Sequence, residues 1–205
     1  MKNKTINKAK ELLKELEGLY LKPYKCPANK WTIGYGDNLE ANGLTADEAK
    51  LVDFDKRVIS AEFITRWQKA GIGTKEIKKA LDQYHKAINI SKATAEVLLD
   101  NEVKKLVQQL TRYDYFNDAP ERVRVALICI CFQCGFVGMH KNIYILVKRW
   151  PGSGTGASYE KKYFIDYIRS NDYNRASAVL KNTTLFKATK ERAIKMADLI
   201  YKEKM

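Results

Sequence analysis

The sequence predicts an α+β protein that is mainly helical, with one short antiparallel sheet near its N-terminus. Apolar residues recur with the helical period over residues 4–17. Residues 20–36 are instead rich in aromatic and β-branched side chains, which favour strands. From residue 45 onward the helical period returns, between capping residues and glycines. With 205 residues, of which 45% are hydrophobic, the chain is long enough to bury a core.

The first predicted helix covers residues 4–17. Its apolar positions are spaced for one helical face, and they are Ile6, Ala9, Leu12, Leu13 and Leu16. Gly18 follows directly and is the type of residue that ends a helix in a left-handed conformation.

A small antiparallel hairpin is predicted next, with strands at 20–25 and 30–36. Cys26, Pro27, Ala28 and Asn29 lie between them and have the composition of a turn.

The rest of the chain predicts a series of helices. Thr45 opens a capping box, Ser91 is a second helix cap, and Gly135 ends the most apolar segment, which begins after Pro120. The predicted helices are Thr45–Trp67, Thr74–Ile88, Ser91 to about Leu110, Val123–Cys134, Met139–Trp150, Tyr159–Ser170, Asn174–Lys181 and Thr189–Glu203, with a loop over Pro151–Gly156.

The net charge of +13 is concentrated in residues 121–205, which hold 16 basic and seven acidic residues. Such a surface favours an anionic polymer, and a merely solvated surface is the alternative. The apolar content excludes a disordered tail. No apolar run approaches the roughly 18–20 residues of a membrane helix, and no signal peptide is evident. We therefore expect synthesis in a cytoplasm and no membrane span.

Three of the four cysteines, Cys129, Cys131 and Cys134, lie within an apolar helix. Cys131 and Cys134 have the spacing of a zinc-ligand pair, but His140 is the only further candidate nearby. Cysteines of this kind pack readily in cores, so we expect neither a metal nor a cofactor.

Glu17, Cys26 and Thr32 are the residues with the clearest chemical potential. The unpaired carbonyls at a helix C-terminus disfavour a carboxylate, so Glu17 is placed to remain protonated, as a general acid must. A hairpin that folds back over this helix end would bring Cys26 and Thr32 near it. An ordinary surface glutamate and two structural hairpin residues are the alternative.

The same residues resemble the phage-type lysozymes (endolysins). That family has a glutamate, eight residues, an aspartate or cysteine, five residues and a threonine, which is the spacing of Glu17, Cys26 and Thr32. The flanking residues 17–24 and 31–36 match as well. Residues 126–135 resemble the family's central helix, residues 186–193 a segment near its end, and residues 90–103 the helix joining its lobes. One departure is Asp37, which stands where a histidine is common.

The resemblance implies a lysozyme-like fold, in one domain over residues 1–205. A small lobe of about 18–45, with a short antiparallel sheet, would lie beside a larger helical lobe of 1–17 and about 90–205. Residues of about 46–89 would form a longer helical connection, and the substrate cleft would lie between the lobes.

The resemblance also implies hydrolysis of the β-1,4 bond between N-acetylmuramic acid and N-acetylglucosamine in peptidoglycan. Glu17 would be the general acid, Cys26 would take the aspartate or cysteine position, and Thr32 would hold a water or the sugar. Arg192 would match a basic residue that pairs with the catalytic glutamate, and this pairing would favour the ionised form of Glu17, against the effect of the helix end. The residues expected to bind substrate are Tyr35, Asp37, Phe132 and Gln133.

Peptidoglycan is the expected partner, with anionic lipopolysaccharide as a further contact, no nucleic acid and a monomeric state. A holin-type pore would carry the protein from the host cytoplasm to the periplasm. Three alternatives stay open. They are a lytic transglycosylase, a catalytically impaired lysozyme fold that binds the wall or serves as a structural phage protein, and a basic nucleic-acid-binding module, although no nucleic-acid-binding motif is evident.

Overall fold

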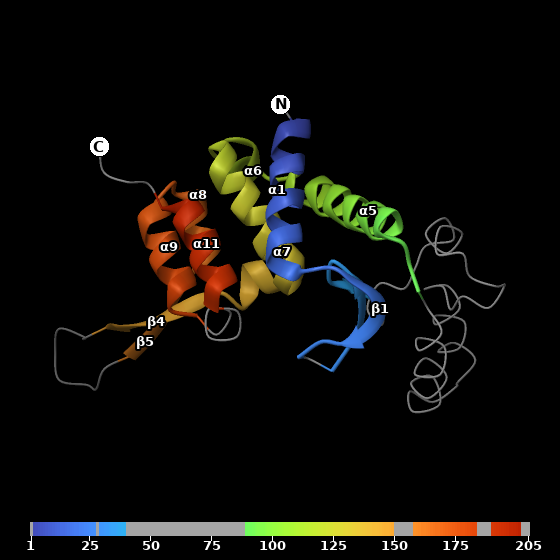
Figure 1. Cartoon of the computed structure of the whole chain (residues 1–205). Coiled ribbons are helices and arrows are strands. Elements are labelled where there is room, and N and C mark those ends of the chain that lie inside the picture. The colour runs from blue at the N-terminus through green and yellow to red at the C-terminus, as the bar shows by residue number, and fades with distance from the viewer. Residues whose placement is uncertain (1, 28, 40–88, 150–157, 184–189, 202–205) are drawn as a thin grey trace, which may run out of the picture. The chain divides into compact units, whose positions relative to one another are not determined.

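A computed structural model describes residues 2–27, 29–39, 89–149, 158–183 and 190–201 (Figure 1). Its elements are α1 (Lys2–Glu17), β1 (Tyr20–Lys25), β2 (Trp31–Gly34), β3 (Asp37–Asn38), α5 (Lys92–Leu110), α6 (Asp114–Asn117), α7 (Glu121–Lys141), β4 (Tyr144–Arg149), β5 (Ser158–Tyr163), α8 (Phe164–Arg169), α9 (Tyr173–Lys181) and α11 (Lys190–Ile200). The structure is mostly helical with small antiparallel sheets, which confirms the predicted α+β class. The chain divides into two compact units, residues 1–12 with 103–205 and residues 13–102. The helices predicted over 45–67 and 74–88 and the loop predicted over 151–156 lie outside the described residues.

Helix α1 ends where the sequence predicts, at Glu17. Gly18 has a φ of 71°, a left-handed conformation that an L side chain rarely adopts. The helix is amphipathic, since Ala9 and Leu13 are fully buried while Lys8 and Glu11 are exposed. The chain therefore leaves the helix at Glu17 and turns directly into β1.

The N-terminal sheet has the strand order β1-β2-β3 and is antiparallel throughout. Strand β1 pairs with β2 through Tyr24 opposite Thr32, and the register shifts between Tyr20 and Tyr24. Pro23 lies inside this irregularity, and proline has no N–H to donate to a ladder. The predicted hairpin is thus confirmed, and the two-residue strand β3 is an addition that is too short to be recognised from its sequence.

Helix α5 begins at the predicted cap. The N–H of Thr94 donates to the Ser91 hydroxyl oxygen over 3.0 Å, a side-chain cap of the type that stabilises helix N-termini. The helix lies against β2, because a Cβ on Gly34 would stand 3.5 Å from the Cβ of Ala95. Just before α5, the N–H of Ile90 donates to the carbonyl of Leu21 over 2.9 Å. The sheet therefore packs against α5, and β1 is hydrogen-bonded to the segment just before that helix.

Helix α7 is the central helix of the unit made of residues 1–12 and 103–205, and it contacts α6, α8 and α11. Every residue from Val125 to Cys131 is buried. Gly135, with a φ of 72°, interrupts the helix where its end is predicted, although a further short helical stretch reaches Lys141. Among the described residues, α7 is the one helix that is long and apolar enough, by length and average composition, to cross a membrane, although its longest uninterrupted apolar run is only residues 125–132. More than half of its most apolar stretch, 56%, is buried in the protein, as in the core helix of a globular domain.

The largest correction to the predicted elements concerns residues 139–170. Helices were predicted over Met139–Trp150 and Tyr159–Ser170, but β4 and β5 form a two-stranded antiparallel sheet with six residue pairs, from Tyr144 opposite Tyr163 to Arg149 opposite Ser158. The aromatic and β-branched content of residues 144–149 suits a strand, and a short apolar run has no period that separates the two states. Helical structure resumes only at Phe164, whose N–H donates to the Ile143 carbonyl.

The last two helices, α9 and α11, agree with the predicted ranges within three residues at each end. One guanidinium nitrogen of Arg122, on α7, donates to three carbonyls at the end of α11, those of Leu199 (2.7 Å), Ile200 (2.6 Å) and Tyr201 (3.2 Å). A cation at this end satisfies carbonyls that have no partner within the helix and complements the helix dipole.

Replacing Arg122 with Met is therefore expected to lower the free energy of unfolding by about 1–2 kcal/mol. The methylene stem is kept, whereas the charged hydrogen bonds and the contact of the guanidinium with the Tyr173 ring, at 5.6 Å, are lost. Chemical denaturation measures this. The matched control is Arg175→Met on α9, which removes an exposed ion pair with Asp172 and should cost less than about 0.5 kcal/mol. Equal losses in the two variants would contradict a capping role for Arg122.

Candidate active site

Glu17, Cys26 and Thr32 all belong to the unit of residues 13–102. Glu17 is the last residue of α1 and is partly buried. Cys26 follows β1 in the turn of the hairpin and is also partly buried, whereas Thr32, on β2, is only 4% exposed. Since two residues separate Glu17 from the start of β1, the helix end leads directly into the hairpin that carries the other two.

Cys26 and Thr32 are linked through one carbonyl group. The Lys30 oxygen accepts the N–H of Cys26 over 3.0 Å and the hydroxyl of Thr32 over 3.1 Å. The turn is closed further by the N–H of Asn29, which donates to the Cys26 carbonyl over 2.7 Å, with Asn29 itself at a φ of 57°. Because the Thr32 proton is used in this bond, the lone pairs of its oxygen remain available to accept a hydrogen bond from a water or a sugar hydroxyl.

Tyr35 and Asp37 lie in and after the turn that joins β2 to β3. Tyr35 is only 6% exposed, so most of its ring is part of the core. Asp37 is partly buried and pairs with Ile33 across the sheet. Gly34 and Gly36 have φ values of 65° and 100°, and the tight turn between the strands depends on them.

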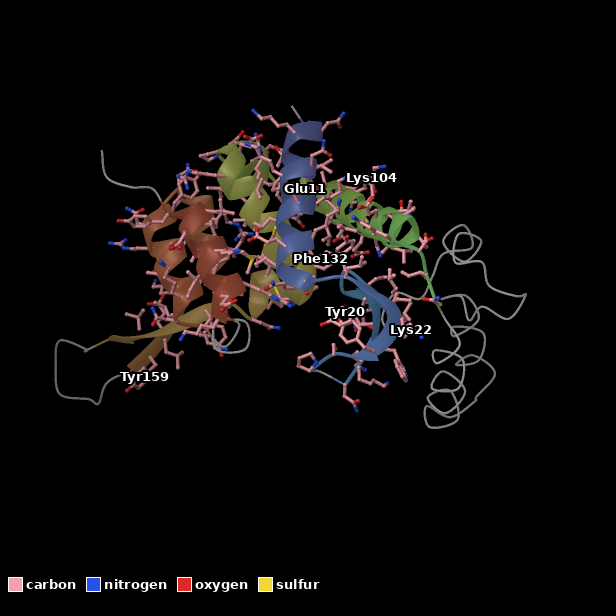
Figure 2. The ribbon with its side chains drawn as sticks, in the orientation of Figure 1. Glu11, Tyr20, Lys22, Lys104, Phe132 and Tyr159 are labelled. Carbon is pink, nitrogen blue, oxygen red and sulfur yellow. The ribbon has the colours of Figure 1, made fainter. Side chains whose placement is uncertain are left out.

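The remaining predicted site residues belong to the other compact unit. Phe132 and Gln133 lie on α7 just before the break at Gly135, and both are partly buried. Phe132 is labelled in Figure 2. Arg192 lies in the first turn of α11 and is partly buried as well.

The cysteines of α7 are thiols in the core. Cys129 and Cys131 are buried, and the Cys134 thiol donates to the Ile130 carbonyl over 3.1 Å. Burial raises the pKa of Cys134 to about 12, so it stays protonated at neutral pH. Zinc binds thiolates, and within the described part of the chain no three His, Cys, Asp or Glu side chains gather as a metal site.

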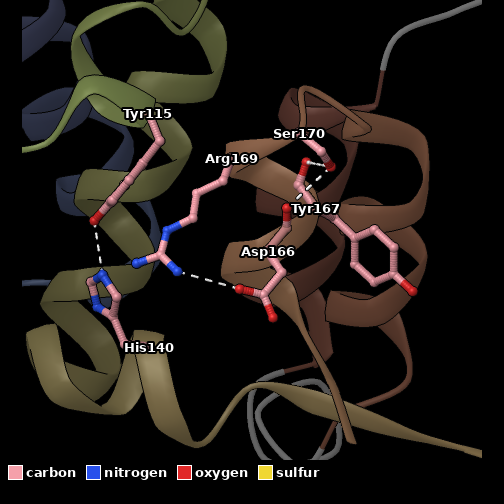
Figure 3. A network of polar contacts seen from close by, with 6 residues as sticks. All are labelled: Tyr115, His140, Asp166, Tyr167, Arg169 and Ser170. Atoms are coloured by element: carbon pink, nitrogen blue, oxygen red, sulfur yellow. Dashed lines mark hydrogen bonds and ion pairs between the residues drawn. The ribbon is translucent and has the colours of Figure 1, made fainter.

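His140 belongs to a cluster of rings that the sequence analysis did not find, together with Tyr113, Tyr115 and Phe136. Figure 3 shows its hydrogen bond with Tyr115. The carbonyl of Phe136 can only accept a hydrogen bond, so the N–H of His140 is at Nδ1 and donates to this carbonyl over 2.8 Å. Nε2 of His140 accepts a hydrogen bond from the Tyr115 hydroxyl over 2.9 Å. Burial raises the pKa of Tyr115, which keeps this donor protonated. The guanidinium of Arg169 lies 5.8 Å from the Tyr115 ring and 3.3 Å from Asp166. The aromatic residues come from α6, α7 and the segment before α6, so no sequence pattern reveals the cluster.

The family model described as Phage lysozyme matches residues 14–151, about two thirds of the chain. The match includes Glu17, Cys26, Thr32, Phe132 and Gln133, and it ends before β5 and Arg192. No curated protein matches the chain.

Proposed function

The chain belongs to the phage lysozyme family and is a lysozyme-type cell-wall hydrolase that acts on peptidoglycan, and from this premise we propose that Glu17 is its general acid. The bond cleaved is the β-1,4 linkage between N-acetylmuramic acid and N-acetylglucosamine. One observation carries the proposal: α1 ends at Glu17 and leads at once into the hairpin on which Cys26 and Thr32 share the Lys30 carbonyl.

In this mechanism the protonated Glu17 donates to the glycosidic oxygen as the bond from that oxygen to the anomeric carbon breaks. Positive charge then develops on the sugar ring, as in other glycosidases. Thr32 holds the attacking water, because its hydroxyl donates to Lys30 and its oxygen accepts from the water. The helix-end carbonyls near Glu17 favour the neutral acid, whereas a cationic partner such as Arg192 would favour the carboxylate.

Cys26 assists this step, as a thiolate base or as a nucleophile. A base in this position would lie about 6.5–9.5 Å from the acid and invert the anomeric configuration, whereas a nucleophile would lie about 5–5.5 Å away and retain it. The anomer first formed, followed by NMR, separates these two roles.

Replacing Cys26 with Ala is expected to lower the rate of wall hydrolysis about 100-fold, the lower range of a general-base contribution. Cys26→Asp should retain most of the activity, because a carboxylate can perform either role. Turbidity of outer-membrane-permeabilised Gram-negative cells reports the rate, with Cys134→Ala as the control for loss of a thiol elsewhere. An unchanged rate in Cys26→Ala would remove Cys26 from the mechanism.

Product analysis tests the reaction type. Mass spectrometry of digested peptidoglycan should show fragments with a reducing N-acetylmuramic acid end. Fragments lighter by one water, with a 1,6-anhydro end, would instead identify a lytic transglycosylase. Absence of any fragment would indicate a fold kept for binding alone.

The remaining assignments rest on the resemblance. We propose that Tyr35, Asp37, Phe132 and Gln133 bind the glycan, and that Arg192 is a basic partner of Glu17, although it lies beyond the matched residues. The excess of basic residues in 121–205 supports contact with anionic lipopolysaccharide. Action as a monomer and release through a holin-type pore complete the proposal.

A further inference from the structure

The sheet of β4 and β5 presents two different faces. Side chains alternate along a strand, and directly paired residues lie on the same face. Tyr144, Leu146, Tyr159, Lys161 and Tyr163 therefore share one face, which we call the tyrosine face. Ile145, Val147, Glu160 and Lys162 share the other. The sheet lies beside α8 and α9 in the unit of residues 1–12 and 103–205 (Figure 1).

The tyrosine face is open to solvent. Tyr159 is 65% exposed and Leu146 is 59% exposed, which places them among the three most exposed large hydrophobic side chains of the described residues. Figure 2 shows Tyr159 directed away from the helices of this unit. The Tyr144 and Tyr163 rings lie 5.7 Å apart, and the ammonium of Lys161 lies 4.3 Å from the centre of the Tyr144 ring. Three rings and a cation thus occupy one side of a two-stranded sheet.

We propose that the tyrosine face binds a glycan strand of the cell wall, at a surface in the other unit from that of Glu17. Tyrosine offers an apolar ring on which the C–H face of a sugar can pack, together with a hydroxyl that hydrogen-bonds at the wet edge. Lys161 is positioned to pair with the carboxylates of the polymer, and no described side chain of this face is acidic. The inference rests on the proposed function only for the identity of the polymer.

A lipid surface is the competing partner, and the distribution of side chains disfavours it. Leu146 is the sole aliphatic residue among the described side chains of the tyrosine face, while Ile145 and Val147 point to the opposite face. That opposite face also carries the ion pair between Glu160 and Lys162, at 2.8 Å. A membrane-binding hairpin would gather its apolar side chains on one side.

Binding to purified, insoluble sacculi tests the proposal, with the full-length Glu17→Gln variant used so that the polymer is not digested. Tyr159→Ser in this background should weaken binding about tenfold, the effect of losing one aromatic contact. The matched control is Val147→Ser, which changes an apolar residue of the opposite face and should bind normally. Lys161→Gln should weaken binding at low salt and flatten its salt dependence.

Activity measurements keep this proposal distinct from the proposed function. With Glu17 present, Tyr159→Ser should cleave a short soluble glycan at the wild-type rate and insoluble sacculi more slowly. Equal sacculus binding by Tyr159→Ser and Val147→Ser would overturn the tyrosine-face proposal while leaving the hydrolase intact. If Tyr159→Ser instead lost binding to phosphatidylglycerol vesicles while its binding to sacculi stayed unchanged, the tyrosine face would be a membrane-binding surface, and the glycan proposal would be overturned.

Discussion

Replacing Glu17 with Gln is expected to stop the clearing of permeabilised Gram-negative cells, with a fall in rate of about 10³-fold. Glutamine keeps the size and hydrogen-bonding outline of the side chain but cannot donate a proton to the glycosidic oxygen. The substitution leaves the end of α1 in place, because that end is determined by Gly18 at its φ of 71°. Loss of activity would therefore report on chemistry, and circular dichroism of the two proteins should coincide.

The matched control for this experiment is Glu15→Gln, two residues earlier on the same helix. Glu15 is exposed, so the variant makes the same chemical change at a position with no proposed role and should clear cells at the wild-type rate. Clearing by Glu17→Gln at the wild-type rate would contradict the assignment of the general acid. If neither the wild-type protein nor the variant clears cells, the lysozyme fold is catalytically impaired, and Cys26→Asp becomes the decisive variant.

Local signals predicted the part of the structure that carries these residues. Gly18 ended α1, the aromatic and β-branched segments formed β1 and β2, and Ser91 capped α5, because each depends on residues only a few positions apart. The spacing of Glu17, Cys26 and Thr32 indicated the family, and the matched family model confirms that resemblance.

Features that depend on distant residues were not predictable in the same way. The strands β4 and β5 form only because each satisfies the backbone of the other, and a single segment such as residues 144–149 does not show its partner. The shared Lys30 carbonyl and the contact of Tyr115 with His140 likewise arise from the folded chain. The roles of the predicted site residues depend on how the substrate binds, and these roles are therefore proposals drawn from the family resemblance.

The second large effect is expected in the core, at Leu127 of α7. Its side chain is fully buried, so Leu127→Ala removes apolar contacts and leaves a cavity that a close-packed interior fills only partly. We expect the free energy of unfolding in aqueous buffer to fall by about 2–5 kcal/mol, measured by urea denaturation. This is a large part of the roughly 5–15 kcal/mol by which most domains are stable.

The matched control lies on the same helix, and the comparison shows whether α7 is a buried core helix or a lipid-facing helix. Val137 is 63% exposed, and Val137→Ala should change the free energy of unfolding by less than about 0.5 kcal/mol. By length and composition alone α7 could cross a membrane, and a lipid-facing helix would lose little when Leu127 is shortened in water. A large loss at Leu127 with almost none at Val137 would follow from burial against neighbouring helices such as α11. Equal, small losses at both positions would mean that α7 is not packed as the core of this unit.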